Sequence, residues 1–153
     1  MPARSFDGAD ISYTTPFSDF NLSVKGFWGS GESDFSSGEY SPITFNDLRS
    51  IGVEFVAFDW SVALKHTQTE AKNDNADSAF VSTSVAQLQP FWSGANAFAD
   101  SLSLRGATIQ YTSVYFNRFL GDWDLSGELS YIDSDSIALR PSFNGFLNLS
   151  YLY

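Results

Sequence analysis

Apolar and polar residues alternate, position by position, along seven separate stretches of the chain. This period of two is that of a β-strand, whose successive side chains point to opposite faces of a sheet. Each stretch therefore predicts a strand with one apolar row and one polar row, and together they predict an all-β, antiparallel up-and-down meander of about seven strands. The stretches are 9–15, 20–28, 50–57, 60–67, 107–115, 123–131 and 145–153.

The alternation is looser in the fifth stretch than in the others. We assign its apolar row to four residues and its polar row to the residues between them. The apolar row is Ala107, Ile109, Tyr111 and Tyr115, and the polar row is Thr108, Gln110 and Thr112.

Short and long connections between these stretches follow one another in turn. The short links are 16–19, the turn at Asp59 and 117–122, whereas 29–46 and 70–103 are long and 133–142 is intermediate. A soluble β-sandwich with one wet face has the same alternation of side chains but no reason for this asymmetry. It is typical of an open or incomplete transmembrane β-barrel with short periplasmic turns and long outer loops.

Aromatic residues mark the ends of the predicted strands. Each short turn has a ring on either side, and a second level of rings lies eight residues further along two of the strands; the set is Phe17, Phe20, Phe58, Trp60, Phe119 and Trp123, with Trp28 and Tyr131 at the second level. Eight steps of about 3.3 Å, tilted by roughly 40°, rise on the order of 20 Å, close to the apolar band of such barrels. We interpret the rings as interface aromatics; the alternative is packing at one end of a soluble sandwich.

Composition changes this picture little. Aromatics make up 17% of the chain, which favours strands. A formal charge of −10 with 8 basic residues gives no electrostatic basis for binding nucleic acid. The absence of cysteine excludes disulfides and thiolate catalysis.

The sequence has no run of 18 apolar residues, so it predicts no membrane-spanning helix. Its mean hydropathy of −0.13 still fits a barrel, in which only alternate residues of each strand face lipid.

The run 5–13, followed by a short turn and then 20–25, resembles the middle strands of gammaproteobacterial outer-membrane porin-like proteins. The resemblance implies a location in the cell outer membrane and a passive channel for small hydrophilic solutes or ions. It implies no enzyme activity, no cofactor and no catalytic residues. The implied partners are outer-membrane lipids and lipopolysaccharide, the remaining strands of the same barrel and, for the parent protein, two further copies in a homotrimer.

Residues 1–153 are expected to form a single β-barrel segment rather than a whole barrel. Complete bacterial barrels have an even number of strands, because an open edge in lipid leaves backbone groups unpaired. Seven strands do not meet that condition, so strands are expected before residue 1. Two readings of the last stretch stay open, in which Tyr153 is a native terminus or the strand continues.

Six charged residues share the polar rows of the predicted strands and are expected to line the pore. Charges in a water-filled lumen set the field that acts on permeating ions, and this mixture predicts weak selectivity, slightly for cations. The alternative is that each is only a solvated or mutually paired residue. The set is Asp10, Lys25, Glu54, Lys65, Asp124 and Glu128.

The link between Glu70 and Ser103 carries apolar residues at helical spacing after Pro90, which predicts a short amphipathic helix. We expect the loop to fold inward and narrow the pore, with Pro90, Phe91, Trp92 and Phe98 as constriction candidates. The alternative is a cap over the outer mouth or against a neighbouring subunit. The acids and amides that open this link, Asn73, Asp74, Asn75 and Asp77, are interpreted as solvated loop residues rather than a metal site.

Three basic residues near the loop end alternate with the polar positions of their strands, so we expect their side chains to face outward. Arg49, His66 and Arg105 are candidates for contact with lipopolysaccharide phosphates, and snorkelling to the interface without a specific partner is the alternative.

Two rival functions remain beside the channel: a soluble all-β module that binds carbohydrate or another ligand, and an outer-membrane barrel enzyme. The second lacks a visible catalytic set, since His66 is the single histidine and no serine lies in a nucleophile elbow.

Overall fold

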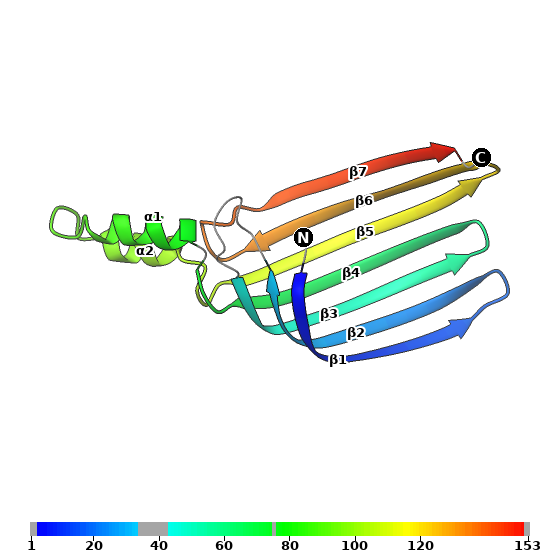
Figure 1. The fold of residues 1–153 in the computed structure, drawn as a ribbon, viewed down its shortest axis with the longest axis horizontal. Coiled ribbons are helices and arrows are strands. Elements are labelled where there is room, and N and C mark those ends of the chain that lie inside the picture. Colours follow the sequence, from blue (N-terminus) through cyan, green and yellow to red (C-terminus); the bar gives the residue numbers. More distant parts are fainter. Residues whose placement is uncertain (1–2, 34–42, 75, 152–153) are drawn as a thin grey trace.

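The computed structural model describes residues 3–33, 43–74 and 76–151. Seven antiparallel strands form one sheet in which every strand pairs with its neighbours in sequence (Figure 1). The predicted all-β meander of seven strands is confirmed. The strands are β1 (Ala3–Pro16), β2 (Phe20–Ser33), β3 (Ile43–Ala57), β4 (Trp60–Ala71), β5 (Thr108–Leu120), β6 (Trp123–Ser134) and β7 (Ser142–Tyr151). Tyr153, on which one expectation fell, lies outside the described residues.

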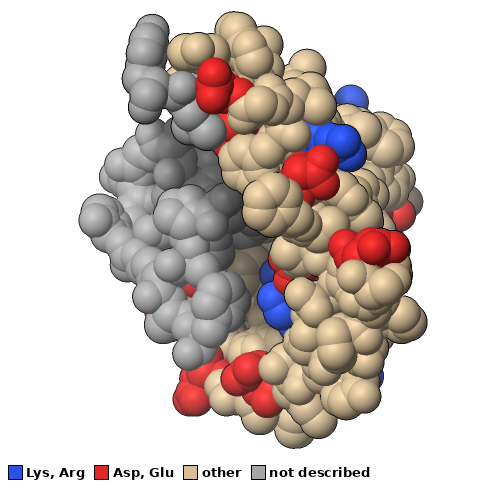
Figure 2. Space-filling view, turned by 90° about the vertical axis from the view of Figure 1, so that its right-hand side faces the viewer, with Lys and Arg blue, Asp and Glu red and all other residues tan. Residues whose placement is uncertain are grey.

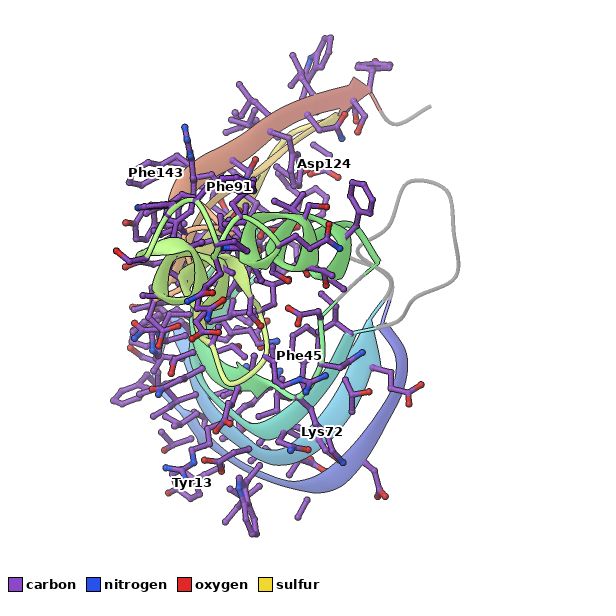
Figure 3. All side chains as sticks on the ribbon, turned by 90° about the vertical axis from the view of Figure 1, so that its left-hand side faces the viewer. Tyr13, Phe45, Lys72, Phe91, Asp124 and Phe143 are labelled. Atoms are coloured by element: carbon purple, nitrogen blue, oxygen red, sulfur yellow. The ribbon has the colours of Figure 1, made fainter. Side chains whose placement is uncertain are left out.

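The register aligns the alternating side chains into rows that cross the whole sheet. Ile11 lies opposite Gly26, Gly26 opposite Ile51, and Ile51 opposite His66. Seen end-on, the sheet is curved like a trough, with Tyr13 and Phe143 on the convex side and Asp124 on the concave side (Figure 3). Because side chains alternate along a strand, every second residue of each strand lies on the convex side and the residues between them lie on the concave side. Within the described residues β1 and β7 are the two edges and do not pair with each other.

The predicted faces of the fifth strand were wrong. Val114 of β5 lies opposite Leu64 on the convex side, whereas Tyr111 lies opposite Thr67 and Tyr115 opposite Ala63 on the concave side. Ile109 shares the concave row, and Ala107 precedes the strand. The physical reason is that a tyrosine ring has a hydroxyl that needs a hydrogen-bond partner, which a polar face supplies.

The sheet has a turn end, where the short links from β1 to β2, β3 to β4 and β5 to β6 lie, and a loop end, where the longer links lie. A small hydrophobic core fills the concave side at the loop end. It consists of Ile43, Phe45, Leu48, Ala71, Leu104, Ile109 and Ile132. Phe45 lies inside the curve of the sheet (Figure 3), and Leu104 comes from the link between β4 and β5. This core therefore ties the base of the long connection to the strands.

Two glycines allow the loop ends of β1 and β2 to approach each other closely. Gly8 and Gly29 are directly paired, and a Cβ added to Gly8 would lie 2.7 Å from the Gly29 Cα and would also overlap the carbonyl oxygen of Trp28. Beyond this pair both strands bend, together with the start of β3, away from the line of β4 to β7 (Figure 1). The close approach is possible only because neither residue carries a side chain.

The long link between β4 and β5 forms a hairpin of two helices, α1 (Ala76–Ala86) and α2 (Ala95–Leu102). The helix predicted after Pro90 corresponds to α2, whereas α1 was not predicted. The hairpin extends beyond the loop end of the sheet, along its long axis (Figure 1). In the described part of the chain, no helix is long and apolar enough to cross a lipid bilayer.

Candidate functional site

The convex face of the sheet presents apolar side chains to its surroundings on every strand. We call the four consecutive rows of this face that pass through Ile11, Val24, Leu22 and Phe20 the convex band. The exposed fraction is 76% for Ile11, 50% for Leu64, 68% for Leu129 and 71% for Leu147. Large apolar side chains in a water-soluble domain are normally buried, so a continuous face of this kind marks contact with an apolar partner or phase. One central row reads Tyr13, Val24, Val53, Leu64, Val114, Leu129 and Gly145.

Aromatic rings border the convex band at its turn end. Phe17 stacks on Phe20 at 4.9 Å between ring centroids, and Phe20 lies 6.4 Å from Trp60 on another strand. Further along the sheet, Trp123 meets Tyr151 edge-on at 5.0 Å. These contacts form two groups of rings along the turn end of the convex band.

Two of the proposed interface aromatics do not lie in this border. Phe119 lies opposite Asp124, which places it in a concave row, and Phe58 is fully exposed in the short turn between β3 and β4. At the loop end, Trp28 and Tyr131 both belong to convex rows, and Tyr131 packs on Phe143 at 4.5 Å. The structure therefore brings six of the eight candidates to the margins of the convex band.

The six proposed pore-lining charges all lie in concave rows. The register places each of them opposite residues of the polar face: Asp10, Lys25, Glu54, Lys65, Asp124 and Glu128. Seen from the turn end, basic and acidic side chains meet in a hollow bounded by the sheet (Figure 2). Of the described His, Cys, Asp and Glu residues, no three or more gather closely enough to hold a metal ion.

Neighbouring strands pair several of these charges with polar partners. Lys25 Nζ donates to Glu54 Oε2 at 2.7 Å, between β2 and β3. The hydroxyl of Tyr111 donates to Glu128 at 2.6 Å, although tyrosine had been assigned to the other face. Lys65, which is exposed, forms no ion pair with any described residue. The concave face is thus polar and only partly neutralised.

A hydrogen-bonded cluster closes the convex band at the loop end. Asp47 has a positive φ of 49° in the irregular stretch of β3 between Asn46 and Arg49. Its carboxylate accepts from Trp28 Nε1 at 3.0 Å and from Arg49 Nε and Nη2 at 2.9 and 2.7 Å. The hydrogen bond from Trp28, followed by that from Arg49, holds the pKa of this exposed carboxyl below its usual range. We call this the Trp28–Asp47–Arg49 clamp.

The three candidate lipopolysaccharide contacts are not brought together. Arg49 is paired with Asp47, which balances its charge. The ring of His66 shares a hydrogen bond of 2.8 Å with the hydroxyl of Thr112 on the same convex row. Arg105 lies in a turn before β5, outside the strands. A common phosphate-binding cluster of the three is therefore not present in this structure.

The constriction candidates lie on the helical hairpin, outside the concave hollow. Phe91 is 90% exposed, and Trp92 packs on Phe98 of the same hairpin, with 5.6 Å between ring centroids. Among the described elements, α1 and α2 pack against each other and neither packs against a strand. The expected inward fold is not what the structure shows, because α2, whose buried residues are Ala95 and Ala99, packs against α1 rather than against a strand.

Asp74 anchors the hairpin, a role that the sequence analysis missed by treating it as a solvated acid. Its carboxylate accepts from the Ser103 hydroxyl at 2.9 Å and from the Leu104 amide at 2.5 Å. It also accepts from the hydroxyl of Ser78 at 3.2 Å. These bonds join the two ends of the hairpin across 30 residues. Asn75 and the side chain of Asp77 lie outside the described residues.

Asp74→Ala is expected to loosen the hairpin base without unfolding the sheet. Hydrogen bonds to a charged carboxylate contribute about 2 kcal/mol, so the neighbouring amides of Ala71 and Gly106 are expected to exchange hydrogen roughly 30-fold faster. These amides currently pair across the same base, to Ala107 and Ala71 respectively. Asp100→Ala is the matched control on α2, and an equal acceleration in both variants would contradict the anchoring role.

No protein-family model, no curated protein and no solved structure matches the chain. The resemblance to outer-membrane porin-like proteins therefore rests on the sequence pattern alone.

Proposed function

We propose that this chain is a wall segment of an outer-membrane porin-like β-barrel, in which it lines a passive pathway for small hydrophilic solutes or ions. One observation carries the proposal. All seven strands present exposed apolar side chains in the convex band, while six charged residues of these strands lie in concave rows: Asp10, Lys25, Glu54, Lys65, Asp124 and Glu128. Leaving one large apolar side chain in water costs about 1.5–3 kcal/mol relative to an apolar environment. A bilayer against the convex face removes that cost.

The loop-end limit of the convex band supports this assignment. Directly beyond the row of Ile11 and Ile51, the same face is polar on four neighbouring strands, β3 to β6. Arg49 lies opposite Gln68, Gln68 opposite Gln110 and Gln110 opposite Asp133. A sharp change from apolar to polar at one height on several strands is what the boundary of a hydrocarbon layer requires.

The concave face suits an aqueous pathway. Four carboxylates and two lysines share its rows, and Lys65 has no ion-pair partner among the described residues. Because the acids outnumber the lysines and Lys25 is already paired with Glu54, the field along the wall is weakly negative. We therefore assign the pathway a slight preference for cations.

The two edges of the sheet indicate what completes the wall. Since each strand is antiparallel to the next, β1 and β7 run in the same direction, from the loop end to the turn end. In a bilayer each edge needs a partner for its backbone groups. An antiparallel closure then requires an odd number of further strands, which we assign to the rest of the same barrel.

A soluble ligand-binding module is less well supported by the structure. Aromatic residues that stack on a sugar would gather in one patch, whereas here they border the apolar band at two heights. No observation favours the barrel enzyme.

The proposal is tested by refolding the full chain from urea in the presence of phosphatidylcholine vesicles. We expect the chain to float with the vesicles after a carbonate wash and to show β-sheet circular dichroism. Flotation without β-sheet circular dichroism would contradict the barrel wall but keep the membrane location. A monomeric product that folds cooperatively in water without lipid or detergent would contradict both.

A further inference from the structure

A shallow groove crosses β1, β2 and β3 on the convex face, close to the loop-end limit of the convex band. Its lower wall, on the side of the turn end, is formed by Ile11 and Ile51. Its upper wall, on the side of the loop end, is formed by Ala9, Trp28 and Arg49. Both walls belong to convex rows, and the row between them points to the other face, so only backbone covers the floor. The exposed fractions of Ile11, Ile51 and Trp28 are 76%, 57% and 64%, so none of the described residues covers the groove.

Gly26 opens the groove because it supplies no side chain between the two isoleucines. A Cβ added there would meet only Ile11 Cγ2 at 3.4 Å and the carbonyl oxygen of Ser50 at 3.9 Å. Other glycines of the convex face are covered. A Cβ on Gly127 would collide with the ring of Phe116 at 2.8 Å, and one on Gly145 would collide with Leu129 at 2.8 Å. An added methyl group is therefore crowded at those two positions but meets no atom closer than 3.4 Å at Gly26.

The upper wall is held in place by the Trp28–Asp47–Arg49 clamp. Asp47 bonds both the indole and the guanidinium, so the two side chains are fixed relative to each other across β2 and β3. The ion pair balances the charge of Arg49 at 2.7 Å. The rim of the groove is therefore polar but carries no net charge.

We propose that this groove binds one hydrocarbon chain of a membrane lipid, selected by shape rather than by the charge of the headgroup. Three features identify that occupant: the groove is lined mainly by apolar side chains, it is continuous with the convex band, and its rim is neutral. The inference rests on the proposed membrane location. It also departs from the expected phosphate contact of Arg49, because the Asp47 carboxylate already balances the charge of that guanidinium.

The experiment uses a full chain in which Trp28 is the single tryptophan, made with Trp60→Phe, Trp92→Phe and Trp123→Phe. It is refolded into vesicles that contain phosphatidylcholine or phosphatidylglycerol with brominated chains, which quench tryptophan on contact. We expect Trp28 to be quenched equally by both lipids and more strongly than the single tryptophan of a Trp123 version. Gly26→Leu, which fills the groove, is expected to remove that extra quenching, whereas Val24→Leu on the same strand and face leaves it unchanged.

The outcomes separate this inference from the proposed function. If neither Trp28 nor Trp123 is quenched, the membrane location fails. If Trp123 is quenched but Trp28 is indifferent to Gly26→Leu, the groove binds no chain and only the convex band stands. Stronger quenching by phosphatidylglycerol would overturn selection by shape. Trp28 shielded from both lipids would show that a second protein copy covers the groove.

Discussion

Leu64→Lys is expected to lower membrane insertion of the chain by roughly 30- to 700-fold, since a lysine facing the bilayer midplane costs about 2–4 kcal/mol. Leu64 lies in a central row of the convex band and is 50% exposed, so a lysine there has no protein partner to shield it. The measurement is the urea concentration at which the chain leaves phosphatidylcholine vesicles, followed by the change in tryptophan fluorescence. The variant is expected to leave at lower urea.

Ala63→Lys is the matched control for this experiment. It introduces the same side chain one residue earlier, on the concave face, where Ala63 lies opposite Glu54. An aqueous concave face accepts the added lysine, so the urea midpoint is expected to change little. Equal losses in the two variants would show that the faces do not differ in environment, and the membrane proposal would then fail.

The faces of most strands could be predicted because alternation is a local property of the sequence. In the second strand, Phe20, Leu22 and Val24 are separated by Asn21 and Ser23, so each residue type identifies its own side. The observed register agrees, since Leu22 and Val24 share convex rows with residues of the same kind on β3. A one-residue slip would move both to the concave face, and strongly amphipathic strands resist it.

The fifth strand was misread because tyrosine does not identify its side. Tyr111 and Tyr115 are large and aromatic, yet both lie on the concave face beside polar residues. The apolar residues that do face outward, Val114 and Phe116, were not used to set the row. The decisive information is the pairing with β4, where Leu64 and Val62 lie opposite them, and this pairing is not a local property.

The hairpin was only half predicted for a similar reason. The helix after Pro90 shows helical spacing and was found, whereas α1 has apolar residues distributed around it with no clear face. The anchor of the hairpin, Asp74, bonds to Leu104 at a separation of 30 residues. Sequence spacing alone gives no sign of such a contact, so neither the anchor nor the direction of the hairpin could be predicted.

Gly8→Ala is expected to destabilise the inserted sheet by about 3 kcal/mol, the upper range for overpacking a well-packed site. The added methyl group would overlap the carbonyl oxygen of Trp28 and lie 2.7 Å from the Gly29 Cα. Both are backbone atoms, so no side-chain rotation relieves the overlap, and β1 must separate from β2 at the loop end. The measurement is the urea midpoint of the vesicle-inserted chain, together with faster hydrogen exchange in residues 7–10.

Gly52→Ala isolates the close approach from the general effect of replacing glycine in a strand. Gly52 also lies in a concave row, but a Cβ there would be 3.6 Å from the Leu64 carbonyl oxygen, an ordinary contact. Alanine restricts the unfolded chain more than glycine, so this variant is expected to be neutral or stabilised by up to about 1 kcal/mol. A loss in Gly52→Ala as large as that in Gly8→Ala would mean that the sheet tolerates no added bulk on its concave face. Unchanged stability in both would instead mean that β1 and β2 do not approach so closely, and that the bend at the loop end has another origin.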